Sequence, residues 1–183
     1  MRKMFQRYAS RTADGTLSGL FAAFLEMPDC FLRSNLEGHF TGSAWLVSND
    51  GQRVLLTHHR KLDRWLQLGG HADGDSDLAR VALREAGEES GLPDLEVEFE
   101  IFDLDRHWIP ERGEVPGHWH YDVRFVVRCG ASEAFVVSEE SHALAWRNIA
   151  EIATDSNADE SLRRMALRWL ERQRGEWGVG SGE

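Results

Sequence analysis

The chain has 183 residues, of which 42% are hydrophobic and 28% charged, which is enough for one compact domain with a sizeable core. Its 31 acidic and 21 basic residues give a formal net charge of -10, so a polymeric nucleic acid is excluded as the expected partner. Small phosphorylated compounds stay open as substrates, provided that divalent cations supply positive charge at the site.

Cys30 and Cys129 are the only cysteines, too few for a disulfide framework and without the paired spacing of a zinc knuckle. The apolar run over residues 17–25 contains Ser18 and Gly19 and is too short to span a bilayer. We therefore expect a protein of the reducing cytoplasm with neither a signal peptide nor a membrane anchor.

The first predicted element is an N-terminal helix that stops before Pro28. Its apolar residues have the spacing of one helical face, which predicts a helical extension over residues 1–37 that covers part of the core. A binding role for this helix is the less favoured alternative. The apolar positions are Leu17, Leu20, Phe21, Phe24 and Leu25.

Two stretches of β-prone residues, 39–47 and 53–59, follow the extension. Asn49, Asp50 and Gly51 supply turn residues between them, which predicts a β-hairpin.

A polar loop is expected to begin at Gly69 and Gly70 and to lead into a helix over residues 77–90. Gly91 is a suitable residue to end that helix, and Pro93 prevents its continuation.

Further strands are predicted over residues 95–104 and 118–128, joined by a loop rich in proline and glycine that could overhang a site. Asn157 and Glu160 have capping-box spacing and predict the start of a C-terminal helix. We place the main domain at residues 38–174 and a frayed tail at residues 175–183. The predicted apolar stripe of the last helix consists of Leu162, Met165, Ala166, Trp169 and Leu170.

The segment with the clearest chemical pattern is residues 69–92, which read GGHADGDSDLARVALREAGEESGL. Glu85, Glu88 and Glu89 are spaced i, i+3 and i+4, so a helix places their Cβ atoms about 5–6 Å apart on one face. Two unit charges about 5 Å apart repel by roughly 3 kcal/mol at an effective dielectric near 20, and a divalent cation reverses this repulsion. Carboxylate oxygens suit Mg²⁺ and also Mn²⁺.

A solvated acidic face is the usual explanation of such a cluster, but its surroundings favour a site. The carboxylates flank the apolar face of the predicted helix, where a cleft can form beside a packed surface. Arg84 can hold one carboxylate in place by a charge-assisted hydrogen bond. The apolar face consists of Leu78, Ala79, Ala82, Leu83 and Ala86.

This segment resembles the sequence box of the Nudix hydrolases, a MutT-like family. One position departs, because Ser76 stands where the family has its first glutamate, and Asp75 looks like the intended carboxylate after a one-residue shift. The resemblance implies an α/β/α sandwich with a mixed β-sheet. The matching residues are Gly70, Arg84, Glu85, Ala86, Glu88, Glu89, Gly91 and Leu92.

The resemblance also implies the site. Glu85, Glu88 and Glu89 would bind Mg²⁺ or Mn²⁺, one of them would help to activate the attacking water, and the carbonyl of Gly70 would be a further ligand. The implied reaction is hydrolysis of a diphosphate bond in a small substrate, either a nucleoside diphosphate linked to another group or a nucleoside triphosphate. Dimers are common among similar proteins, so a homodimer stays open.

The strand over residues 118–128 alternates apolar and polar side chains. We expect the polar side chains, among them His120 and Arg124, to face solvent, as is common for antiparallel strands. A substrate-facing role is one alternative. A zinc site made by His118, His120 and Asp122 is a more remote one.

Some further residues are weaker candidates. Glu139 follows the last long strand in an acidic segment and is an additional metal-ligand candidate by resemblance, although a solvated loop is the commoner case. His58 and Arg60 belong to a basic cluster that either faces the substrate phosphates or forms a surface turn. Trp65 and Trp108 are candidates to stack on a base, although a core position is commoner for tryptophan.

Two other functions compete with hydrolysis. An isomerase of the isopentenyl diphosphate type shares the fold but needs a catalytic cysteine near the sheet, and neither Cys30 nor Cys129 has that setting. A nucleotide sensor without turnover would keep the fold, but the complete set of Glu85, Glu88 and Glu89 argues against it.

Overall fold

The computed structural model describes residues 1–59, 63–136 and 141–175. Helices and strands follow one another in the order α1 (Arg2–Arg11), α2 (Gly15–Phe24), β1 (Gly38–Val47), β2 (Arg53–His59), β3 (Arg64–His71), α3 (Leu78–Ser90), β4 (Glu96–Ile109), β5 (His118–Arg128), β6 (Ser141–Asn148), α4 (Ile149–Thr154) and α5 (Glu160–Gln173).

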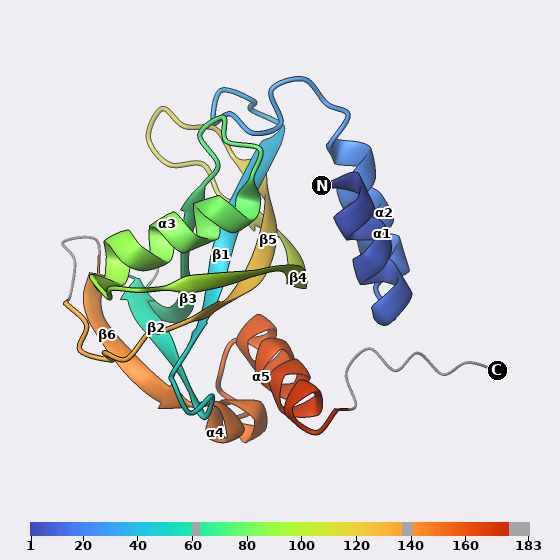
Figure 1. The fold of residues 1–183 in the computed structure, drawn as a ribbon. Coiled ribbons are helices and arrows are strands. Elements are labelled where there is room, and N and C mark those ends of the chain that lie inside the picture. Colours follow the sequence, from blue (N-terminus) through green and yellow to red (C-terminus); the bar gives the residue numbers. More distant parts are fainter. Residues whose placement is uncertain (60–62, 137–140, 176–183) are drawn as a thin grey trace.

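The strands form one mixed sheet with the order β4-β5-β1-β3-β2-β6. β1 and β5 run parallel, and the other neighbouring strands are antiparallel. Helix α3 packs on one face, and α4 and α5 lie on the other, near the ends of β1 and β5 (Figure 1). The predicted α/β/α sandwich with a mixed sheet is therefore confirmed.

The predicted hairpin between the first two strands forms only next to its turn. The turn is present, but β1 and β2 pair only at Val47 and Val54, and the rest of each strand is separated by β3. β3 was not predicted, because Gly69 and Gly70 near its end favour a loop over a strand. Gly69 and Gly70 instead pair with Ser43 and Gly42 of β1.

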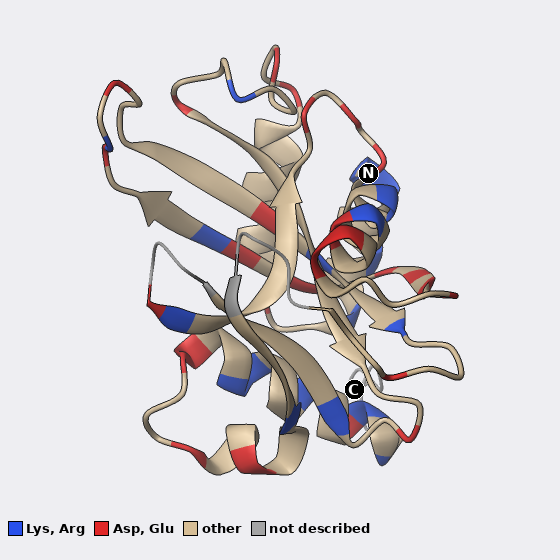
Figure 2. Ribbon diagram, turned by 90° about the vertical axis from the view of Figure 1, so that its left-hand side faces the viewer, with Lys and Arg blue, Asp and Glu red and all other residues tan. Residues whose placement is uncertain are grey.

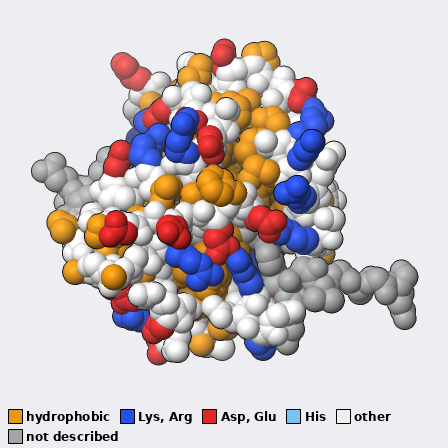
Figure 3. Space-filling model, viewed as in Figure 1, with side chains coloured by type: hydrophobic (Ala, Val, Ile, Leu, Met, Phe, Trp, Pro, Cys, Tyr) orange, Lys and Arg blue, Asp and Glu red, His pale blue; other side chains and the backbone are white. Residues whose placement is uncertain are grey.

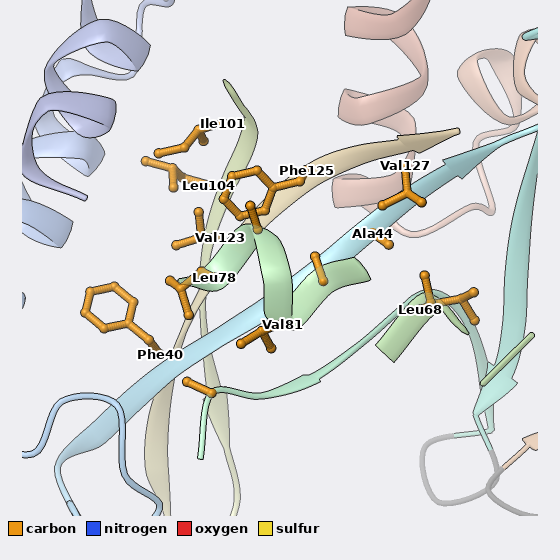
Figure 4. Packing of buried hydrophobic residues seen from close by; sticks show 14 of the residues in the cluster. Phe40, Ala44, Leu68, Leu78, Val81, Ile101, Leu104, Val123, Phe125 and Val127 are labelled. Atoms are coloured by element: carbon orange, nitrogen blue, oxygen red, sulfur yellow. The ribbon is translucent and has the colours of Figure 1, made fainter. Parts of the chain in front are cut away.

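Alternation along β1 divides the core between the two faces of the sheet. Phe40, Ala44 and Leu46 belong to the cluster under α3, while Trp45 and Val47 belong to the cluster under α4 and α5. Figure 4 shows side chains of α3 directed at strand residues of the first cluster. From the side of α3, hydrophobic side chains are visible between charged ones (Figure 3).

The N-terminal extension contains two helices, of which only α2 was predicted. Phe5 of α1 and Phe21 of α2 are buried in the same cluster as α3, and Phe24 stacks on Tyr121 with ring centroids 3.7 Å apart. Leu20 was predicted to belong to the buried apolar stripe, but this residue is 40% exposed. The extension is thus part of the packed core, as predicted for a covering helix.

The C-terminal helix has the predicted apolar face, but its cap differs. Leu162, Met165 and Trp169 of α5 are buried. The capping residue is Asp159, whose side chain accepts a hydrogen bond from the backbone N–H of Ser161, so the predicted cap at Asn157 is wrong.

A buried ion network joins the sheet to α5. Asp103 of β4 is fully buried, and its carboxylate accepts hydrogen bonds from Arg124 of β5 at 3.1 Å and from Arg164 of α5 at 2.8 Å. Arg168 of α5 bonds both Asp103 and Asp14, so the network also reaches the N-terminal extension.

Elsewhere, acidic and basic segments are interleaved along the described chain (Figure 2). None of its helices is both long enough and apolar enough to cross a membrane.

We expect Asp103→Asn to lower the free energy of unfolding by about 3 kcal/mol or more, because the substitution leaves buried arginines without their counter-charge. Urea unfolding at neutral pH measures this loss. The control, Glu26→Gln, removes an exposed ion pair with Arg2 and should cost less than about 1 kcal/mol. Equal losses for the two variants would contradict a stabilising role for the buried network.

Candidate active site

The candidate site lies where the end of β3 meets α3. Residues 72–77 connect the two elements in a short turn. Asp77 caps α3 by accepting a hydrogen bond from the backbone N–H of Arg80 at 3.2 Å. Gly91 ends the helix in the left-handed conformation, with φ of 65°, as predicted from its position.

Two glycines that face each other across β1 and β3 let α3 lie directly on the sheet. A Cβ atom on Gly42 would lie 2.8 Å from the carbonyl oxygen of Leu78 and 3.0 Å from the side chain of Val81. A Cβ atom on Gly70 would overlap the carboxylate of Glu85. At both positions glycine allows a close approach, and neither has a special backbone conformation.

Hydrogen bonds tie the box carboxylates to the end of β3. Glu89 accepts a bond from the backbone N–H of Gly69 at 2.8 Å. Glu85 accepts a bond from Arg84 at 2.7 Å, and the same guanidinium group donates to the carbonyl of His71 at 3.2 Å. The hydrogen bond to Glu85 raises the pKa of Arg84. The structure thus brings Arg84, Glu85 and Glu89 together with the glycine backbone.

Glu88 differs from the other two carboxylates. It is exposed, whereas Glu85 and Glu89 are half-buried. Within the described part of the chain it makes no hydrogen bond or ion pair. Its carboxylate therefore stays available to a ligand at the edge of the site.

Asp75, the expected substitute for the missing first glutamate, is held by Arg80 through two hydrogen bonds of 2.8 and 2.9 Å. The bond from Arg80 lowers the pKa of the Asp75 carboxyl group. Ser76 is exposed. A metal-binding role for Asp75 stays a prediction. In that role its carboxylate would bind a cation while it is paired with the guanidinium group of Arg80.

Other predicted residues lie apart from the carboxylates. Trp65 and His58 are neighbours on β3 and β2, with ring centroids 5.1 Å apart. Trp65 and Gly70 are five residues apart on β3, so their Cα atoms are separated by about 16 Å along the strand. Arg60 and Glu139 lie outside the described residues, so their predicted roles stay predictions.

The polar side chains of β5 are not solvated as predicted. Asp122 and Arg124 are each 2% exposed, and they bond each other at 2.7 Å. Asp122 also accepts bonds from Thr41 and Ser43 of β1. These side chains are buried because β5 is an interior strand, and the polar side chains of the neighbouring β1 lie on the same face of the sheet.

His39 and His71, which were not predicted as site residues, lie near His120 on this face. The alternation of His39, Thr41 and Ser43 along β1 was the available signal. A β-prone run by itself does not show which strand will lie beside it.

Neither cysteine is placed to act as a nucleophile. Cys30 and Cys129 are buried, and burial raises the pKa of both thiols. This setting does not support the alternative isomerase function.

Comparisons with known proteins agree with this architecture. Residues 39–170 match the model of the NUDIX domain family. Because this match spans well over half of the chain, the protein belongs to the Nudix hydrolase family. No curated protein matches the chain.

Solved structures share the fold. A hydrolase of the NUDIX family from Clostridium perfringens has a TM-score of 0.55 at 22% identity, covering 74% of this chain and 97% of that one. A MutT protein from Methanosarcina mazei Go1 has a TM-score of 0.58 at 17% identity, covering 75% and 96%. An Ap4A hydrolase from C. elegans has a TM-score of 0.56 at 13% identity, covering 74% and 98%.

We expect Gly42→Ala to lower the free energy of unfolding by about 1–3 kcal/mol, because the added methyl group meets the backbone of α3, which cannot move aside. Denaturant unfolding tests this. Gly87→Ala is the matched control, since a Cβ atom at Gly87 has no neighbour within 4 Å and alanine favours a helix, so stability should rise by about 0.5–1 kcal/mol. A neutral Gly42→Ala would show that α3 is not in close contact with β1.

Proposed function

We propose that this protein hydrolyses a diphosphate linkage in a small, nucleoside-containing phosphorylated compound, with Mg²⁺ or Mn²⁺ held by the carboxylates of α3. The observation that carries the proposal is the arrangement of Glu85, Glu88 and Glu89 beside the backbone of Gly69 and Gly70.

The donor set fits a hard divalent cation. Three carboxylates share one edge of α3, and the carbonyl of Gly70 belongs to the strand that faces Glu85. Oxygen ligands of this kind suit Mg²⁺ and Mn²⁺ rather than softer metals. When bound, the cation supplies the positive charge that offsets the phosphate oxygens during attack by water.

The chain's own residues then have different tasks. Arg84 and the N–H of Gly69 fix Glu85 and Glu89, so these two carboxylates need little reorganisation on binding. Glu88 is the exposed member and is our candidate to accept a proton from the attacking water.

The substrate class follows from charge and size. A protein with a net charge of -10 has no general attraction for polyanions, so the local site must select a compact phosphate group. Nucleoside triphosphates, dinucleoside polyphosphates and nucleotide sugars satisfy this requirement. The similar fold of an Ap4A hydrolase supports including dinucleotides among the test compounds.

The direct test is phosphate release from a panel of these compounds, with coupling pyrophosphatase or phosphatase, in Mg²⁺ or in EDTA. We expect turnover of at least one compound in Mg²⁺ and none in EDTA. Glu88→Gln should lower turnover by about a hundredfold or more, because the amide cannot accept the proton. Glu160→Gln, at an exposed position of α5, is the matched control and should keep full activity.

Two outcomes would reject the proposal. Turnover in EDTA equal to that in Mg²⁺ would show that the reaction does not require a metal ion. A silent panel combined with tight binding of one of its nucleotides would identify a sensor instead of an enzyme.

Gly70→Ala tests the position of Glu85 separately. The added methyl group meets only the flexible end of that side chain, so we expect stability to stay within about 1 kcal/mol of the wild type. Turnover should fall by about a hundredfold, because the carboxylate is displaced by roughly 1 Å. Gly87→Ala should leave turnover unchanged. Wild-type turnover in Gly70→Ala would show that Glu85 needs no fixed position.

A further inference from the structure

Three histidines surround a common point on the face of the sheet opposite α3. The ring centroids of His39 and His71 are 5.0 Å apart, those of His39 and His120 4.8 Å, and those of His71 and His120 5.0 Å. One ring nitrogen from each residue can be chosen so that all three lie within 4.8 Å of one another. The rings thus form a nearly equilateral triangle.

Strand pairing sets this arrangement. His39 of β1 is in direct register with His120 of β5, and His71 of β3 is in register with Thr41, two residues further along β1. Side chains two residues apart on a strand share a face, so the three histidines project from adjacent interior strands to the same side. Their backbones are held by the sheet rather than by a loop.

His39 has a buried ring with unused hydrogen-bonding capacity. It is 2% exposed, and neither ring nitrogen makes a hydrogen bond of normal geometry within the described residues. A buried polar group without a partner is costly and rare, and a water or an ion bound there would offset that cost. His71 and His120 are only half-buried, so the triangle is open to solvent on their side.

We propose that His39, His71 and His120 bind a divalent transition-metal ion of the Zn²⁺ class, at a site separate from the carboxylates of α3. With zinc–nitrogen distances of about 2.0–2.1 Å, tetrahedral geometry places the ring centroids of three histidines about 5 Å apart, which agrees with the observed triangle. Imidazole nitrogen suits zinc, copper or nickel, and it does not suit Mg²⁺.

An ordinary histidine ring is largely neutral near pH 7, and a neutral ring offers a lone pair to a metal ion. The nearby charge of Arg33 is offset by Asp73, which accepts two hydrogen bonds from it at 2.5 Å.

His118 is a positioning residue for this site. It bonds the carbonyl of Pro116 through Nδ1 at 2.9 Å, which leaves its Nε2 directed at Nε2 of His120, 3.3 Å away. In a neutral His118 this Nε2 is an acceptor, so His120 donates from its own Nε2, and such a bond from the other ring nitrogen is the usual way to orient a histidine at a metal site. Three protein ligands leave one tetrahedral position for a ligand from solvent.

The two proposed sites are close in sequence but lie on opposite faces of β3. Gly70 faces Glu85 of α3, and the next residue, His71, projects to the histidine side. The histidine site does not depend on the proposed hydrolysis, because it uses none of the carboxylates.

Cobalt and zinc titration of the tag-free, metal-stripped protein in excess Mg²⁺ tests the proposal. We expect one equivalent of Co²⁺ to bind with visible d–d absorption, Zn²⁺ to displace it, and Zn²⁺ to raise the thermal midpoint. His71→Asn and His120→Asn should each weaken binding by about tenfold or more. These two positions are only half-buried, so their variants avoid the folding risk of a substitution at His39.

Controls distinguish this site from the carboxylates. His58→Asn removes a histidine from another part of the sheet, and Glu88→Gln alters the acidic cluster; both should bind Co²⁺ like the wild type. Absence of binding, or equal binding in the His71 and His120 variants, would overturn the proposal. Loss of binding only in Glu88→Gln would place the ion at α3 instead.

Discussion

The site depends on the direct contact between α3 and the paired glycines of β1 and β3. Gly42 lets the backbone of α3 reach the sheet, and Gly70 leaves room for the carboxylate of Glu85. The acidic residues alone would repel one another on any exposed helix. Close packing instead fixes Glu85 and Glu89 beside the backbone of Gly70 and Gly69, so the glycine and the glutamates of the box lie side by side.

Interior strands give the molecule two chemically different surfaces. On the side of α3, the end of β3 meets carboxylates. On the opposite side, β1, β3 and β5 bring together histidines and a buried Asp122–Arg124 pair. Because side chains alternate along a strand, the neighbouring residues Gly70 and His71 serve opposite faces. One strand end thus borders both the proposed carboxylate site and the proposed histidine site, whose ligand atoms suit different metals.

The N-terminal extension is integrated into the domain by packing and charge. Phe24 stacks on Tyr121 of β5, and Asp14 shares Arg168 with the buried Asp103. The family match begins at residue 39, so these contacts come from outside the matched region. They cover the edge formed by β4 and β5 and stabilise the strand that bears His118 and His120.

The features that depend on local spacing could be predicted from the sequence. These are α3 with its ending at Gly91, the shared face of Glu85, Glu88 and Glu89, and the family to which the box belongs. Only the folded chain shows that β3 separates β1 from β2, that the polar face of β5 is buried, and that His39 and His71 lie near His120. The physical reason is that helical neighbours are set by covalent spacing, whereas neighbours in a sheet are set by pairing between distant segments.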